Sequence, residues 1–73
     1  MKKAAFFEEL KDTLELDGII KETTVLHLTS LAILSVIVLV DEKFDKQIRT
    51  VDLKNVSTVV SLMELIGLEN FEL

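Results

Sequence analysis

Residues 31–40 constrain the fold of this chain most, because they read LAILSVIVLV and contain one polar residue, Ser35. A surface helix of a small domain normally has one apolar stripe and one polar face. This segment instead has apolar residues where the polar face would be expected. A helix of this length would span about 15 Å, roughly half of a bilayer core, so we do not expect it to insert into a membrane.

The composition predicts one small folded domain that covers residues 1–73. Hydrophobic residues make up 49 % of the chain and charged residues 29 %, which is typical of a folding sequence. Because cysteine is absent, disulfides and thiolate metal sites are excluded and packing must supply the stability. The net charge of −5 disfavours nucleic-acid partners and is compatible with basic proteins. The apolar stretch after the first two lysines is too short for a secretory signal, so we expect a cytoplasmic protein.

The hydrophobic pattern predicts an all-α fold, a four-helix bundle with three longer helices and one short third helix. We expect the first helix over residues 3–16, stopped by Asp17-Gly18. A long connection over residues 17–28 then lacks a helical period. It is rich in large apolar residues, so we expect it to lie against the bundle.

The second helix is expected to begin at Thr29-Ser30. The Thr29 hydroxyl is a suitable N-cap, because it can accept a hydrogen bond from a free backbone N–H one turn on. Ser30 would then be the first helical residue. Residues with the three-to-four spacing of a core face follow along this helix. They are Ile33, Val36, Ile37, Val40 and Phe44.

The C-terminal third predicts a short helix and a longer one. Residues 46–56 provide a connector and one helical turn capped by Thr50. The last helix would have Ser57 as its N-cap and Gly67 as its C-cap. Residues 68–73 either fray or dock through Phe71 and Leu73. The residues expected on the inner side of the last helix are Val59, Leu62, Met63 and Ile66.

A second apolar stripe remains on the second helix once its core face is assigned. Leu31, Leu34 and Val38 recur at i, i+3 and i+7, on another side of the helix. Exposing one such side chain forgoes about 1.5–3 kcal/mol of burial free energy. Either the helix is central and buried all round, or the stripe docks a partner. The residues that border the stripe are Ser35, Asp41 and Glu42.

Several short motifs and the spacing between them make this chain resemble the acyl carrier protein family. Members of that family are small four-helix domains with a 4′-phosphopantetheine arm on a serine. The family's attachment motif, Asp-Ser-Leu at the head of the second helix, corresponds here to Thr29-Ser30-Leu31. Fourteen residues after the serine, where the family commonly closes a Glu-Glu-x-Phe stretch, this chain has DEKF. The family pattern continues with an isoleucine, a short third helix and a Thr-Val pair, and this chain has Ile48, VDLKN and Thr58-Val59 at the matching positions. The resemblance therefore covers nearly the whole chain.

The resemblance implies that Ser30 carries the arm, which a phosphopantetheinyl transferase attaches from coenzyme A. The thiol of the arm would hold acyl or aminoacyl intermediates as thioesters and present them to loading and processing enzymes. Such a carrier serves fatty acid or secondary metabolite biosynthesis and is not itself an enzyme, so no catalytic residue is expected. The expected partner-binding residues are Thr29, Leu31, Leu34, Ser35, Val38, Asp41 and Glu42.

Two departures from the family pattern indicate a specialised, discrete carrier. Thr29 replaces an aspartate whose carboxylate, in the family, helps the modifying synthase to position its substrate and metal. The second helix also has few acids, placed mainly at positions 41, 42 and 45. The alternative is a carrier-like interaction module that is never modified.

The residues around Ser30 do not predict catalysis. A serine nucleophile needs a base within hydrogen-bond reach and a third group that holds the base. His27 is the only histidine, and it lacks neighbours at metal-ligand spacing. We therefore expect His27 to be an ordinary loop residue and the chain to have no metal site. We expect a monomer, although the stripe could also pair with a copy of itself.

Overall fold

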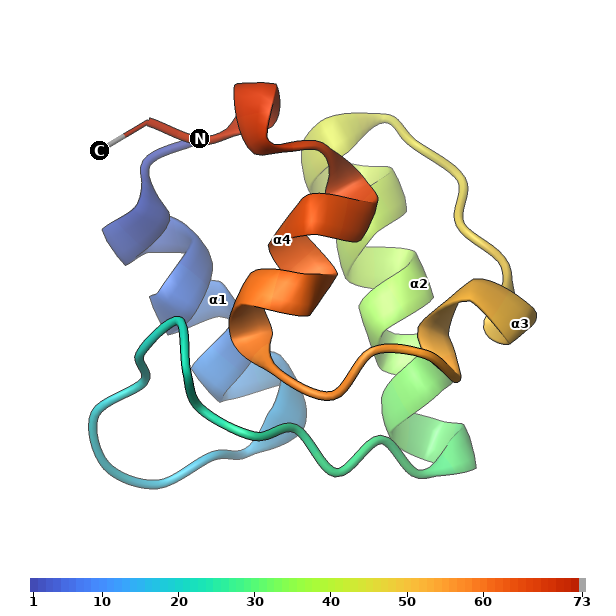
Figure 1. Cartoon of the computed structure of the whole chain (residues 1–73), viewed down its shortest axis with the longest axis horizontal. Helices are drawn as coiled ribbons and strands as arrows, with labels where there is room; N and C mark the ends of the chain where they lie inside the picture. Colours follow the sequence, from blue (N-terminus) through green and yellow to red (C-terminus); the bar gives the residue numbers. More distant parts are fainter. Residues whose placement is uncertain (73) are drawn as a thin grey trace.

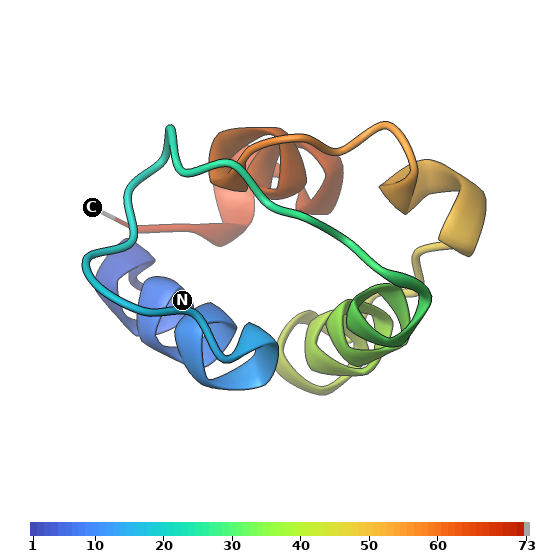
Figure 2. The same cartoon turned by 90° about the horizontal axis from the view of Figure 1, so that it is seen from below.

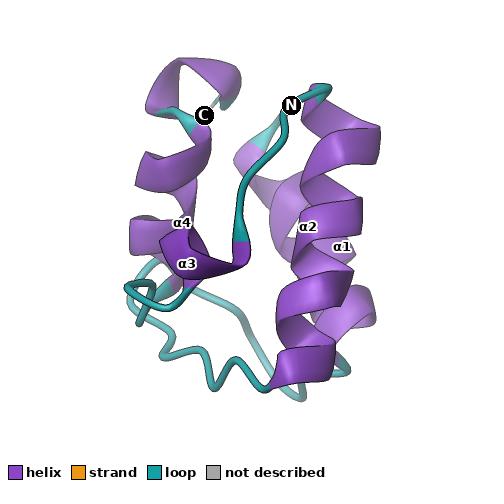
Figure 3. Cartoon of the chain, turned by 90° about the vertical axis from the view of Figure 1, so that its right-hand side faces the viewer, coloured by secondary structure: helices purple, strands orange, loops and turns teal. Residues whose placement is uncertain are grey.

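Four α-helices form two layers in a computed structural model, which describes residues 1–72. They are α1 (Lys3–Leu14), α2 (Ser30–Phe44), α3 (Thr50–Leu53) and α4 (Val59–Ile66), followed by the 3-10 helix η1 (Leu68–Asn70) (Figure 1). α1 lies beside α2 in one layer, and α4 and α3 form the other (Figures 2 and 3). Within residues 1–72 there is no β-sheet, only two isolated β-bridges. The predicted all-α bundle, with a short third helix and a long first connection, is confirmed.

The core lies between the two layers and is entirely apolar among the described residues. All four positions predicted to face inward on α4 are buried. On α2 the core is shifted relative to the prediction: Leu39 is buried, whereas Ile37 and Phe44 are only partly buried. The shift arises because α1 packs beside α2 and covers the side on which Leu39 lies. The largest fully buried side chains are Phe6, Leu10, Leu53, Leu62, Met63, Ile66, Val36, Val40 and Val59.

α1 ends at Leu14, two residues before its predicted end. Glu15 takes a left-handed conformation with φ 53°, and the N–H of Leu16 donates to the carbonyl of Lys11 over 2.9 Å. This turn reverses the chain before Asp17-Gly18 is reached and returns Leu16 to the core. The predicted stop was placed too late, because the backbone turns at a glutamate rather than at the glycine.

The long connection, residues 15–29, is joined to the start of α4 by backbone hydrogen bonds. The N–H groups of Val59 and Val60 donate to the carbonyls of Thr24 and Glu22, over 3.0 and 2.9 Å. Two of the N–H groups that a helix start leaves free are thereby satisfied. The connection lies against the bundle as predicted, although not along its whole length. Its buried side chains include Ile20 and Leu26, and its exposed ones Ile19 and Val25.

α4 begins one residue later than predicted, with Thr58 rather than Ser57 as its N-cap. The N–H of Ser61 donates to Oγ1 of Thr58 over 3.3 Å, and the N–H of Thr58 donates to Oγ of Ser61 over 2.9 Å. This reciprocal pair requires polar side chains three positions apart. Ser57 cannot form it, because the residue three positions later is Val60. Gly67 ends the helix as predicted, with φ 113° and its N–H bonded to the carbonyl of Met63.

α3 also begins one position away from the prediction. Thr50 is its first helical residue, and Arg49 occupies the N-cap. The carboxylate of Asp52 accepts a hydrogen bond from the backbone N–H of Arg49 over 3.1 Å. The start of this single turn is therefore fixed by an acid inside the helix rather than by a threonine before it.

Phe71 and Glu72, which follow η1, dock on the bundle and do not fray. The ring centroid of Phe71 lies 4.9 Å from that of Phe6 and 5.2 Å from that of Phe44. Backbone hydrogen bonds of 2.8 Å join this segment to the first residues of the chain, so the two ends lie side by side (Figure 1). Phe71 therefore docks as predicted, whereas Leu73, the other predicted anchor, lies outside the described residues.

The aromatic cluster predicts a stability effect at a position near the end of the chain. Phe71→Ala should lower the free energy of unfolding by about 2 kcal/mol, because the two neighbouring rings lose their partner. The matched control is Leu68→Ala, since Leu68 is 54 % exposed and should cost less than about 0.5 kcal/mol. Urea denaturation followed by circular dichroism measures both. Equal losses for the two variants would show that Phe71 is not docked.

Candidate functional site

Ser30 lies at the first helical position of α2, as predicted, and its residue is exposed. The preceding residue, Thr29, is extended and caps the helix: its Oγ1 accepts a hydrogen bond from the N–H of Ala32 over 3.2 Å. The carbonyl of Thr29 accepts the first helical bond, from the N–H of Ile33, over 2.8 Å. The cap therefore fixes the backbone on both sides of Ser30 and leaves the serine side chain outside the helical ladder.

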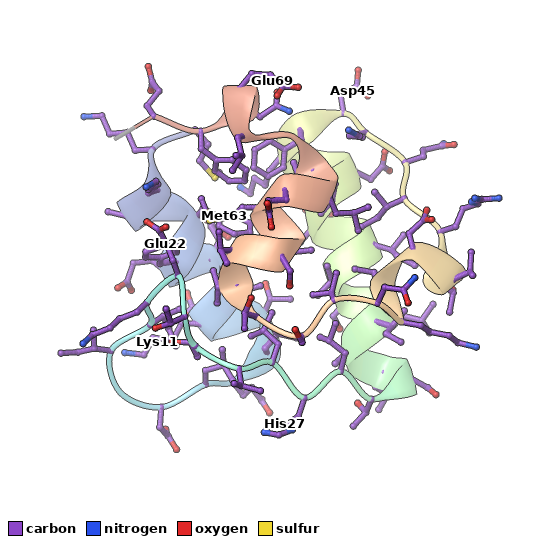
Figure 4. The ribbon with its side chains drawn as sticks, in the orientation of Figure 1. Lys11, Glu22, His27, Asp45, Met63 and Glu69 are labelled. Carbon is purple, nitrogen blue, oxygen red and sulfur yellow. The ribbon has the colours of Figure 1, made fainter. Side chains whose placement is uncertain are left out.

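No hydrogen bond within residues 1–72 joins the hydroxyl of Ser30 to an acidic or basic side chain. His27 lies in the connection that leads into α2, and its side chain points outward at the edge of the molecule (Figure 4). No hydrogen bond links His27 to Ser30 in residues 1–72. His27 is a loop residue, as predicted.

The apolar stripe of α2 is exposed to solvent. Leu31 is 78 % exposed, Leu34 58 % and Val38 54 %. At 100° per residue these side chains lie on the side of the helix opposite to fully buried Val40. The interpretation that α2 is buried all round is therefore wrong. α2 has two apolar sides, and only one of them belongs to the core.

An open groove of about 450 Å³ runs beside the stripe, between α2 and α1. Five of the predicted partner-binding residues line it: Leu31, Leu34, Ser35, Val38 and Glu42. A second hollow of about 290 Å³ continues toward the start of α2, and Thr29 lines it together with Leu31 and Ser35. The predicted residues Asp41 and Ser30 line neither hollow, and both are exposed.

Four residues of the groove were not predicted from the sequence, and one of them is the buried Leu39 of α2. Glu9 and Thr13 come from α1, and Lys43 comes from the last turn of α2. Lys43 Nζ lies 3.7 Å from Glu9 Oε1, and this partly exposed ion pair joins the two helices at one end of the groove. The i, i+4 spacing of Glu9 and Thr13 places them on one face of α1. Which face of α1 lies next to α2 depends on tertiary packing, so the sequence pattern alone could not pair these residues with the stripe.

The acids and bases near the stripe are distributed unevenly along α2. The first turn of the helix contains no acidic residue, whereas Asp41, Glu42 and Asp45 are exposed at its C-terminal end. Lys43 is the basic residue of the last turn and is paired with Glu9. The first turn of α2 is consequently free of carboxylates, whereas Glu15 lines the hollow near Thr29 and the far end of the helix has an excess of acids.

The first turn of α2 fits a covalently attached phosphodiester on Ser30. The exposed N-terminal end of a helix has a partial positive charge that favours an anion. No acid of the first turn opposes such an anion, and Thr29 supplies the cap without the negative charge that an aspartate would add. A phosphate on Ser30 Oγ would therefore meet no carboxylate from the first turn of α2 or from its cap.

Two further properties of residues 1–72 concern metals and membranes. No group of three or more His, Asp or Glu side chains there could hold a metal ion. None of the helices in this part of the chain combines the length and apolarity needed to cross a membrane. Comparisons with protein-family models, with curated proteins and with solved structures find no match to this chain.

The cap at Thr29 predicts a measurable effect on stability. Thr29→Ala should lower the free energy of unfolding by about 1 kcal/mol, because the N–H of Ala32 loses its acceptor. Thr23→Ala, at an exposed turn residue of the preceding connection, is the control and should change it by less than about 0.5 kcal/mol. Thr29→Asn should keep most of the stability, since an amide oxygen can replace the hydroxyl. A neutral Thr29→Ala in urea denaturation would contradict the capping role.

Proposed function

We propose that this protein is a carrier that holds acyl or aminoacyl groups as thioesters on a 4′-phosphopantetheine arm attached to Ser30. The observation that supports this most is the exposed Ser30 hydroxyl at the capped start of a helix with an exposed apolar side. A separate transferase that activates the hydroxyl needs access to it, and it needs no base from the carrier itself. The resemblance of Thr29-Ser30-Leu31 and of DEKF at 41–44 to the acyl carrier protein family adds to this proposal.

The arm would supply the reactive thiol, and the chain would supply tethering and recognition. A tethered substrate reaches a partner's active site at a high effective concentration if the arm can span the gap. The Leu31, Leu34 and Val38 side chains would provide the apolar contact with the transferase and with loading or processing enzymes. Asp41 and Glu42 at the far end would meet basic groups of those partners.

Intact-mass spectrometry after incubation with a phosphopantetheinyl transferase of broad specificity and coenzyme A tests the proposal. We expect the wild-type chain to gain the mass of one arm and Ser30→Ala to gain none. Ser57→Ala is the matched control, because Ser57 is another exposed serine just before a helix, and it should be modified as the wild type is. No gain on the wild type, or the same gain on Ser30→Ala, would contradict the carrier proposal.

The second candidate is an interaction module that keeps the fold but is never modified. It is favoured by Thr29, which lacks the carboxylate that assists modification in the family that the chain resembles. Thr29→Asp distinguishes the two candidates: for a carrier it should leave the site of modification at Ser30 and raise its rate. For an unmodified module, neither the wild type nor Thr29→Asp should gain an arm.

A further inference from the structure

The exposed side of α2 is nearly self-complementary. Its apolar residues are distributed almost evenly about a midpoint between Leu34 and Ser35. A two-fold axis at this midpoint would place Leu31 of one chain against Val38 of a second chain. Leu34 would then lie across from Ser35, whose small side chain allows the two helices to approach closely. An isologous contact of this kind uses the same patch on both molecules.

The charges on α2 favour an antiparallel pair of helices. Asp41, Glu42 and Asp45 are exposed at the C-terminal end, and the basic residue of that turn, Lys43, is already paired with Glu9. In an antiparallel pair these acids would lie over the N-terminal end of the other α2, which has no acid in its first turn. In a parallel pair they would face one another and repel.

The groove beside the stripe also takes part in the contact with a second copy. The groove of about 450 Å³ is bounded by the stripe on one side and by Glu9 and Thr13 of α1 on the other. In this register the two-fold axis sets the stripe of each chain against the stripe of the other, and the two grooves face each other beside it.

We propose that the chain self-associates into a dimer through antiparallel pairing of α2 with α2 of a second copy. One helix pair with its flanking grooves is smaller than a standard interface, which buries about 800 Å² per partner, so the dimer is weak and depends on concentration. The proposal replaces the expectation of a monomer. It depends on the stripe and not on modification of Ser30, so it stands or falls separately from the carrier proposal. Enzymes that dock on the stripe would compete with the second copy.

Sedimentation equilibrium over protein concentrations up to about 1 mM tests the association itself. We expect the weight-average mass of the wild type to rise toward that of a dimer. Leu34→Glu should weaken the association by at least about tenfold, because it places an unpaired charge against the apolar midpoint. Val51→Glu is the matched control, since Val51 is 54 % exposed on α3, away from the stripe, and it should associate as the wild type does. Circular dichroism verifies that both variants are folded.

Cross-linking tests the orientation, because the wild-type chain has no cysteine. Leu31→Cys and Val38→Cys are mixed in equal amounts and treated with a short bis-maleimide, and the products are identified by intact mass. Antiparallel pairing predicts that mixed 31–38 dimers exceed both homodimers. A monomer up to about 1 mM, an unchanged association of Leu34→Glu, or an excess of homodimers would overturn the proposal.

Discussion

Val36 and Val40 are completely removed from solvent on one side of α2, and the fold depends on this burial. α2 is the longest helix and packs beside α1, with α3 and α4 in the facing layer (Figures 1 and 3). Its core side contributes four buried residues to one continuous apolar cluster. A helix can bury only the sides that its neighbours cover. The other layer lies on one side of α2, so the apolar residues on the opposite side remain in water.

The exposed side of α2 reduces stability, and binding is the simplest reason to keep it. Each large apolar side chain left in water forgoes up to about 1.5–3 kcal/mol, whereas a domain of this kind is stable by only about 5–15 kcal/mol. Ser30 begins the same helix, whose first turn contains no acidic residue. A group attached there would lie next to a surface suited to protein contact. Docking of partner enzymes and pairing of two chains would use the same surface, so the two would compete.

Features set by neighbouring residues could be predicted from the sequence, and features set by packing could not. The Thr29 cap and the C-cap at Gly67 are local, and both predictions are confirmed. The start of α4 was also encoded locally, but its signal was the three-residue spacing of Thr58 and Ser61, not a single serine. The burial of Leu39 and the approach of Glu9 to the stripe follow from the placement of α1, which no periodicity specifies. The exposure of the stripe was one of two open interpretations, and only the structure separates them.

α2 has a buried and an exposed apolar side. Solvent paramagnetic relaxation of methyl groups in nuclear magnetic resonance spectra, with a soluble gadolinium chelate and dilute, monomeric protein, separates the two sides. We expect strong relaxation enhancement for the methyl groups of Leu31, Leu34 and Val38, and little for those of Val36 and Val40. Comparable protection of both sets would contradict it, because the stripe would then be part of the core.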